Sequence, residues 1–185
     1  VLILPAPAVG ADPRIRSAVD VFQIGPEKKT LLDLYVTSRE AARAVASYPD
    51  VVLIDVRAPS DVQAVGIAIP VHRNVPYLVA NDSVAEGRPA MAVNPKLVTH
   101  VDRVLRGKRL DRSATIVIMC IAGVHSARAA DHLAERGFKN VYTVVDGFEG
   151  DRGPNGGRTV NGWRNHNLPW SLTARSDQMA FALPR

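Results

Sequence analysis

The sequence is poor in cysteine and in aromatic side chains. Its 185 residues include a single cysteine, Cys120, and only 5% are Phe, Trp or Tyr. A single cysteine excludes an intramolecular disulfide and a zinc site built from several thiolates. Any chemical role of Cys120 would therefore be that of a free thiol, which makes it the first residue to examine.

The signatures of a nucleic-acid-binding module are also missing, although the chain is basic. Its formal net charge of +5 suits an anionic partner. No zinc-finger, RNP or helix-turn-helix pattern is found, and few aromatic residues are available to stack on bases. We therefore expect no nucleic-acid partner. We interpret the local basic cluster as a solvated face formed by Arg103, Arg106, Lys108, Arg109 and Arg112.

No apolar run is long enough to span a bilayer, so we expect no transmembrane span. Residues 1–11 are uncharged and apolar, but Pro5 and Pro7 interrupt them. Residues 9–11 fit the small-residue pattern that precedes signal-peptidase cleavage. We interpret residues 1–11 as the remnant of an export signal, which predicts a periplasmic or exported bacterial protein. The alternative is an apolar arm packed on the domain.

Three β-branched apolar runs predict buried strands of a parallel sheet, at residues 51–55, 116–120 and 141–145. Helical patterns lie between these runs. The alternation of strand and helix predicts an α/β fold, with helices on both faces of a central, mostly parallel sheet.

The predicted helices have readable ends. Thr37 and Glu40 form a capping box at the start of the first helix. Asn94 and Pro95 provide a cap and an N1 proline for a second helix, which Gly107 closes. A third helix is predicted from residue 126 to residue 136, just before a glycine.

Cys120 stands where a predicted strand ends and is followed by a short loop that leads into a helix. The loop consists of Ile121, Ala122, Gly123, Val124 and His125, and the helix is predicted to begin at Ser126. Backbone N–H groups of such a loop and of a helix N-terminus converge on one point and favour a thiolate there. Gly123 would let the loop turn back, and Ser126 can cap the helix. The alternative is a buried, inert cysteine.

Charged residues follow the neighbouring strand end. Asp55, Arg57 and Asp61 supply acids and a base that can pair locally. In open α/β sheets, ligands bind in the crevice at the carboxyl ends of the strands. We therefore expect these residues to support the rim of the crevice that holds Cys120.

These features together resemble the ordered landmarks of rhodanese domains. The landmarks are residues 54–57 with a following acid, residues 74–76, the C-x-x-G-x-x-S loop at 120–126, and residues 145–148. The resemblance implies a rhodanese-like fold with a five-stranded, mostly parallel sheet. It places the domain at residues 31–150, after an N-terminal arm at 12–30 and before a C-terminal extension at 151–185 that packs on it. The flanks resemble exported bacterial single-domain rhodaneses.

The resemblance implies a sulfurtransferase. Cys120 would attack the outer sulfur of a small anionic or persulfidic donor, such as thiosulfate, a persulfide or a polysulfide. It would hold that sulfur as a persulfide and pass it to a thiol or cyanide-like acceptor. Amides of the loop from Ile121 to Ser126 would stabilise the persulfide anion. Neither a metal nor an organic cofactor is implied.

The cysteine loop departs from the family pattern, which resembles C-R-S-G-D-R-S. Both loop arginines are absent, and His125 replaces the second. An arginine offers a charged, planar fork to a sulfonate, whereas a histidine with a pKa near 6.5 is mostly neutral at pH 7. Ile121, Ala122 and Val124 also make the rim apolar. These changes predict weak thiosulfate activity and a preference for persulfide or polysulfide donors.

Other functions remain as alternatives. Loss of the loop arginines favours a non-catalytic rhodanese-like module that binds a protein partner. Phosphatases of this fold need an arginine six residues after the cysteine, where this chain has Ser126. A metal site at Cys120, His125 and His132 is disfavoured, because no carboxylate cluster accompanies them. The remaining histidines show no constellation: His72, His100 and His166.

Overall fold

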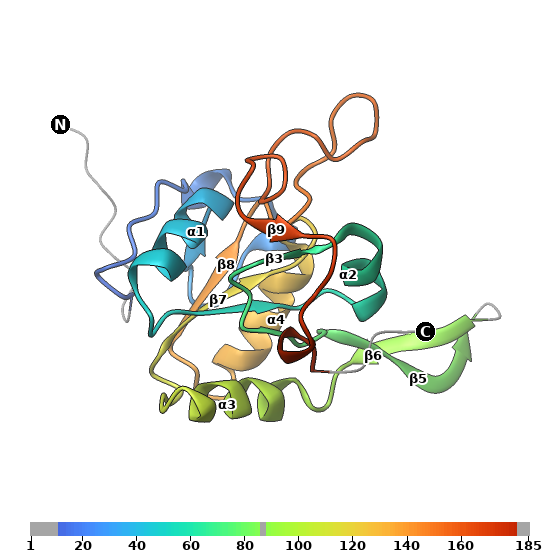
Figure 1. Ribbon diagram of the computed structural model, residues 1–185, viewed down its shortest axis with the longest axis horizontal. Helices are drawn as coiled ribbons and strands as arrows, with labels where there is room; N and C mark the ends of the chain where they lie inside the picture. The colour runs from blue at the N-terminus through green and yellow to red at the C-terminus, as the bar shows by residue number, and fades with distance from the viewer. Residues whose placement is uncertain (1–10, 86–87, 181–185) are drawn as a thin grey trace.

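Five parallel strands form the central sheet of the computed structural model, which describes residues 11–85 and 88–180 (Figure 1). In sheet order the strands are Tyr35–Val36 (β1), Asn140–Val144 (β8), Thr115–Met119 (β7), Val52–Asp55 (β2) and Arg73–Asn74 (β4). Every neighbouring pair is parallel. The predicted α/β fold with a five-stranded sheet is therefore confirmed, and the sheet is wholly rather than mostly parallel.

Helices cover both faces of this sheet, as expected. Within the described residues the α-helices are Ser38–Ser47 (α1), Pro59–Val65 (α2), Leu97–Gly107 (α3) and Val124–Ala134 (α4). Side chains of α1 and α2 belong to one buried apolar cluster, and those of α3 and α4 belong to another. Along β7, Val117 and Met119 join the first cluster, whereas Ile116 and Ile118 join the second. Because successive strand residues point to opposite faces, a continuous apolar run serves both cores.

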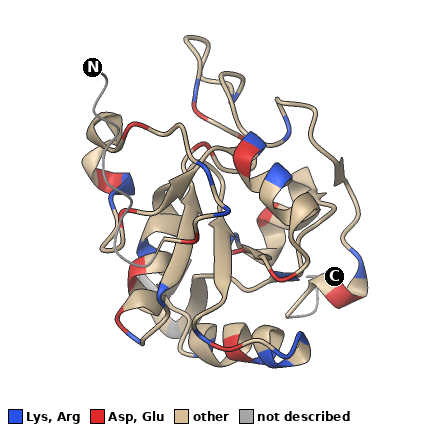
Figure 2. Ribbon diagram, turned by 90° about the vertical axis from the view of Figure 1, so that its left-hand side faces the viewer, with Lys and Arg blue, Asp and Glu red and all other residues tan. Residues whose placement is uncertain are grey.

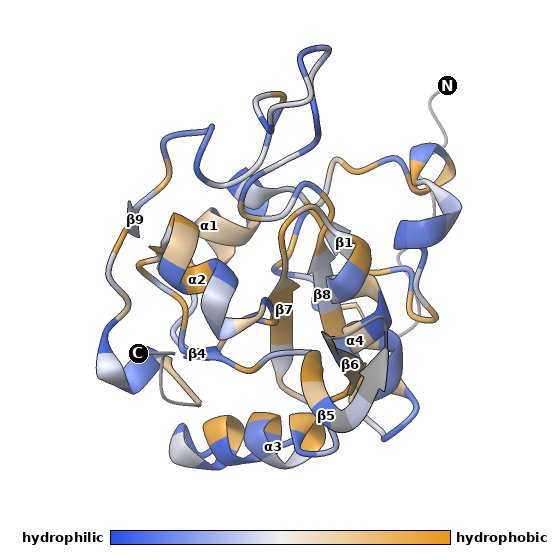
Figure 3. Ribbon diagram, turned by 90° about the vertical axis from the view of Figure 1, so that its right-hand side faces the viewer, coloured by the Kyte–Doolittle hydropathy of each residue, from blue (hydrophilic) through white to orange (hydrophobic). Residues whose placement is uncertain are grey.

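The surface and the interior differ sharply in chemistry. Hydrophobic residues concentrate on β7 and on the sheet-facing stripe of α3 (Figure 3). Charged residues of both signs lie mainly on helices and loops (Figure 2). In the basic cluster, Arg112 forms an exposed ion pair with Asp102 of α3 at 2.7 Å. The basic residues of this cluster that are exposed are Arg103, Arg106, Arg109 and Arg112.

The predicted helix starts have mixed outcomes. The capping box of Thr37 and Glu40 is confirmed at α1. The prediction that Asn94 caps α3 is wrong, because the helix begins at Leu97 after Lys96. Asn94 instead holds the preceding turn: its Oδ1 accepts the Lys96 N–H at 2.9 Å, and its amide donates to the carbonyl of Pro76.

The helix α4 also begins earlier than the sequence predicts. The helix begins at Val124, and Gly123 is its N-cap with a φ of +96°. Ser126 therefore lies inside the first turn and does not cap the helix, contrary to the prediction. The reason is the glycine, whose left-handed conformation reverses the chain immediately before the first helical residue.

A β-hairpin that the sequence did not predict projects from the body of the molecule (Figure 1). Its antiparallel strands are Leu78–Ala85 (β5) and Arg88–Val93 (β6). Met91 and Val93 are exposed on it. The hairpin follows Tyr77 directly, so its base lies beside the carboxyl ends of β2 and β4.

The N-terminal arm and the C-terminal segment both pack against the domain that contains the sheet. The N-terminal arm contains short 3₁₀ turns at Val21–Gln23 (η1) and Pro26–Lys28 (η2). In the C-terminal segment, Trp170–Ser171 (β9) pairs with Ile67–Ala68 (β3), and Trp163 is fully buried. The last described turn is Ser176–Gln178 (η3), and its Gln178 amide donates to the carbonyl of Val71 at 3.1 Å.

The expected export-signal remnant at residues 1–11 lies outside the described residues, except for Ala11. Among the helices of the described ranges, none is both long and apolar enough to cross a membrane.

Asp12 ties the N-terminal arm to the amino ends of the strands. Its carboxylate accepts the Thr115 hydroxyl at 2.6 Å and the Arg14 guanidinium at 2.8 Å. Its backbone N–H donates to the Tyr142 hydroxyl at 2.9 Å. The hydrogen bond from Arg14 is the main reason why the pKa of Asp12 is lowered from 3.8 to about 2.

We expect Asp12→Asn to lower the free energy of unfolding at pH 7 by about 1–2 kcal/mol. Because the folded-state pKa lies below the unfolded value, this stabilisation is present above about pH 4 and is lost as the pH falls towards 2. Urea unfolding at pH 7 and at pH 2.5 measures the difference between wild type and variant. The exposed Asp177 offers a control, Asp177→Asn, and an Asp12→Asn effect that does not shrink at pH 2.5 would contradict the assignment.

Candidate active site

Cys120 follows β7 directly and its sulfur is held by the loop that it begins. The residue is 2% exposed and its thiol is free. Its Sγ accepts the Gly123 backbone N–H at 3.2 Å and lies 3.4 Å from Ser126 Oγ. The Ser126 hydroxyl donates to the Gly123 carbonyl at 3.0 Å. The sulfur therefore sits at the N-terminus of α4 in contact with a backbone donor, a position that favours negative charge.

Gly123 makes this arrangement possible. A Cβ at this residue would lie 2.4 Å from the carbonyl oxygen of Val145, in addition to the strain of a φ of +96°. The glycine lets the loop approach the chain after β8 and still direct its N–H at the sulfur. Ile121, Ala122 and Val124 are half-buried around this turn.

The loop after β8 supports the cysteine loop through backbone hydrogen bonds. The N–H of Phe148 donates to the Cys120 carbonyl at 2.8 Å, and the N–H of Glu149 donates to the Ile121 carbonyl at 3.0 Å. Gly147, with a φ of +61°, approaches Ile121 so closely that a Cβ would lie 2.4 Å from its carbonyl oxygen. The backbone of Cys120 and Ile121 is thus bound to a second tight loop.

Asp55 and Arg57 form a buried ion pair next to these loops. The Arg57 Nη2 lies 2.6 Å from Asp55 Oδ2, and both side chains are fully buried. The same nitrogen donates to the Gly66 carbonyl at 2.9 Å, and the guanidinium lies 4.1 Å above the centre of the Phe148 ring. Asp61 lies in the first turn of α2, half-buried, and takes no part in this pair. The pair contacts the loop after β8 through Phe148 and, being fully buried, does not form an exposed rim.

His125 is the polar side chain of the loop that faces solvent. It is exposed in the first turn of α4, and its ring centre lies 6.3 Å from that of Tyr77. Tyr77 precedes the hairpin directly, and no local pattern predicted that it would lie beside the cysteine loop. His125 and Tyr77 bring the cysteine loop and the hairpin base together.

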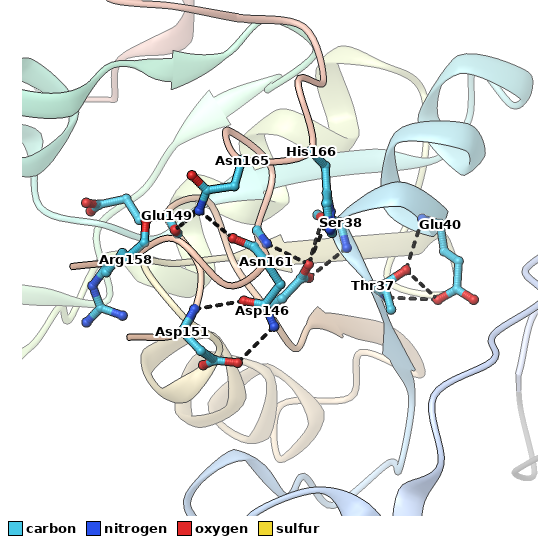
Figure 4. Close-up of polar contacts among 11 residues, drawn as sticks. Thr37, Ser38, Glu40, Asp146, Glu149, Asp151, Arg158, Asn161, Asn165 and His166 are labelled. Atoms are coloured by element: carbon cyan, nitrogen blue, oxygen red, sulfur yellow. Dashed lines mark hydrogen bonds and ion pairs between the residues drawn. The ribbon is translucent and has the colours of Figure 1, made fainter. Parts of the chain in front are cut away.

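Asp146 organises the second loop through a buried network (Figure 4). Its carboxylate accepts the Ser38 N–H and hydroxyl, each at 2.7 Å, and the Gly162 N–H at 3.0 Å. His166 Nδ1 lies 2.8 Å from Ser38 Oγ and 3.7 Å from Asp146. The expectation that His166 belongs to no constellation is therefore wrong. Since Ser38 and His166 are 128 residues apart, no local pattern could have connected them.

Burial is the main influence on the pKa of His72, His100 and His132. His72 Nδ1 accepts the Leu53 N–H at 3.1 Å, and burial lowers the pKa of His72. Burial also lowers the pKa of His100 and of His132. Within residues 11–85 and 88–180, no group of three or more His, Cys, Asp or Glu side chains could hold a metal ion.

Comparison with known proteins gives one broad match and several partial ones. A family model described as a rhodanese-like domain matches residues 37–152. The uncharacterised protein RP600 of Rickettsia prowazekii is 40% identical over 57 residues, which are 31% of this chain and 42% of that protein. The thiosulfate sulfurtransferase GlpE of Coxiella burnetii is 38% identical over 42 residues, which are 23% of this chain and 39% of that protein. The chain therefore matches less than half the length of these curated relatives.

A solved structure extends the similarity to most of the fold. Rv0390 from M. tuberculosis superposes with a TM-score of 0.56 at 28% identity, over 75% of this chain and 97% of that chain.

We expect Gly123→Ala to destabilise the protein more than Gly137→Ala. Both glycines have positive φ, but a Cβ at Gly137 meets nothing within 4 Å. Backbone strain alone should cost about 1–2 kcal/mol at Gly137, and the clash with Val145 should add about 1–2 kcal/mol at Gly123. Chemical unfolding measures both, and the reaction rate of Cys120 with a thiol reagent in the folded state should change only in Gly123→Ala. Equal effects in the two variants would show that the close approach to Val145 is unimportant.

Proposed function

Because this chain belongs to the rhodanese-like domain family, we propose that it is a sulfurtransferase in which Cys120 carries the transferred sulfur. The observation that carries the proposal is the position of the Cys120 sulfur at the end of a buried strand, 3.2 Å from the Gly123 amide and at the start of α4. At this point the Gly123 N–H and the N-terminus of α4 both direct positive potential towards the sulfur.

The chemistry is a double displacement. The Cys120 thiolate attacks the outer sulfur of the donor, a new S–S bond forms, and the donor's own bond to that sulfur breaks. The remainder leaves with the electron pair, as sulfite from thiosulfate or as a thiolate from an organic persulfide. A thiol or cyanide-like acceptor then attacks the terminal sulfur and regenerates the Cys120 thiolate. The amide of Gly123 contacts Sγ, so it is placed to stabilise the Cys120 thiolate before the donor is attacked and after the acceptor has removed the sulfur.

The loop favours a persulfide or polysulfide donor over thiosulfate. Ile121, Ala122 and Val124 present apolar side chains, and the loop contains no arginine. A sulfonate would lose its charged, bidentate partner here. An apolar or less charged donor suffers less from that loss.

A second candidate function is a module that binds a protein partner without catalysis. The observations that favour it are the nearly complete burial of Cys120 and the absence of loop arginines. Sulfur uptake by Cys120 discriminates between the two functions.

Periplasmic location also stays a proposal, supported by the composition of residues 1–11 and testable by cell fractionation.

We expect Cys120 to gain one sulfur atom when the protein is incubated with an organic persulfide, and to gain it more slowly from thiosulfate. Intact-protein mass spectrometry before and after reduction follows the adduct, and Cys120→Ser is the control that should gain none. Equal or faster transfer from thiosulfate would refute the donor preference. No added sulfur from any donor would favour the binding module.

We expect His125→Arg to raise the rate of sulfur uptake from thiosulfate by about 10-fold, because a permanently charged fork would bind the sulfonate. The matched control is His132→Arg, which adds the same charge in the last turn of the same helix. Stopped-flow or quenched assays with thiosulfate and with an organic persulfide measure the change for each donor. An equal gain in both variants would mean that net charge, and not the loop, controls the rate.

A further inference from the structure

Lys28 belongs to η2 in the N-terminal arm, outside the segment that matches the family model, yet it reaches the cysteine loop. Its side chain is 17% exposed. Its ammonium donates to the Val145 carbonyl at 3.0 Å and to the Asp151 carboxylate at 3.0 Å. One side chain of the arm therefore binds the chain on both sides of the loop that carries Gly147 and Phe148.

The Lys28 side chain also lies beside Gly123 of the cysteine loop. The point where a Gly123 Cβ would stand lies 2.4 Å from the Val145 oxygen and 3.1 Å from Lys28 Cδ. Lys28 and Val145 thus enclose Gly123, and the hydrogen bond between them holds that enclosure together. Gly123 in turn donates its N–H to the Cys120 sulfur. The path from Lys28 to the sulfur therefore runs through the Val145 carbonyl and Gly123.

The ion pair that anchors Lys28 is itself well supported. Although burial pushes the pKa of Asp151 up, hydrogen bonds from Asn161 and Lys28 hold it below its ordinary value. Asn161 donates to Asp151 Oδ2 at 2.9 Å, and its Oδ1 accepts the Asp151 N–H at 2.8 Å. The carboxylate is therefore oriented towards the lysine. A charge-assisted hydrogen bond of this kind is stronger than a neutral one.

We propose that Lys28 is a positioning residue for Cys120: it clamps Val145 over Gly123 and so keeps the Gly123 amide on the sulfur. The proposal rests on the proposed function in that Cys120 is taken as the sulfur carrier. The lysine stays bound to Val145 and Asp151 and does not itself contact the donor. The arm thereby contributes to the site without supplying a reacting group.

The test compares Lys28→Met, which keeps the aliphatic stem and removes the ammonium, with Lys28→Arg, which restores a donor. Lys29→Met is the matched control, because Lys29 is the next residue and is exposed. Hydrogen–deuterium exchange measures the order of residues 120–126 and 144–150 in the whole folded protein. Sulfur uptake by Cys120 at varied concentrations of an organic persulfide separates the maximal rate from the donor concentration at half-maximal rate.

We expect exchange in both loops to quicken about 3- to 10-fold in Lys28→Met, with exchange in α3 unchanged. The maximal rate of sulfur uptake should fall about 3- to 10-fold at an unchanged half-saturating concentration. Lys28→Arg should recover at least half of both losses, and Lys29→Met should match wild type.

Unchanged loop exchange in Lys28→Met, or the same change in Lys29→Met, would overturn the proposal. A fall in rate with normal loop exchange would overturn it too, because Lys28 would then act on the donor and not on the loop. If no donor transfers sulfur to the wild-type protein but loop exchange responds as expected, the sulfurtransferase function fails and the clamp stands.

Discussion

The backbone hydrogen bonds between the loop after β7 and the loop after β8 are the constraint on which the site depends. Because the two strands are adjacent and parallel, their carboxyl ends leave the sheet side by side. The carbonyls of Cys120 and Ile121 then find donors in Phe148 and Glu149. These bonds satisfy polar groups that burial would otherwise leave unpaired, and they fix the backbone that carries the thiol.

Each of the two loops is secured by a different part of the chain. Asp146 is bound by Ser38 at the start of α1 and by Gly162 in the C-terminal segment. Just before Asp146, the ammonium of Lys28 in the N-terminal arm donates a hydrogen bond to the Val145 carbonyl. The N-terminal arm and the C-terminal segment therefore both bind the loop after β8, which supports the cysteine loop. The loops at the carboxyl ends of β7 and β8 are held by several parts of the chain.

The charged residues of the strand-end motif at 54–57 are buried inside the fold. Arg57 of this motif packs against Asp55 and Phe148. The cysteine loop itself offers only an exposed histidine. The group that contacts the thiol directly from the loop is the backbone N–H of Gly123, and the loop contains no arginine, which is the basis on which we propose a donor with little negative charge.

The sequence by itself determined the elements whose signals are local. Local patterns predicted the strands β2, β7 and β8 from their apolar runs and the start of α1 from its capping box. These signals are local because burial and end-capping act over a few residues. Gly123 predicted the turn after Cys120, although α4 begins at Val124, two residues before the start that the sequence predicts at Ser126. Only the tertiary structure decided which distant residues meet there. Lys28 and Val145 are 117 residues apart and Ser38 and His166 are 128 apart, so their contacts follow from chain packing and leave no periodic or motif signal.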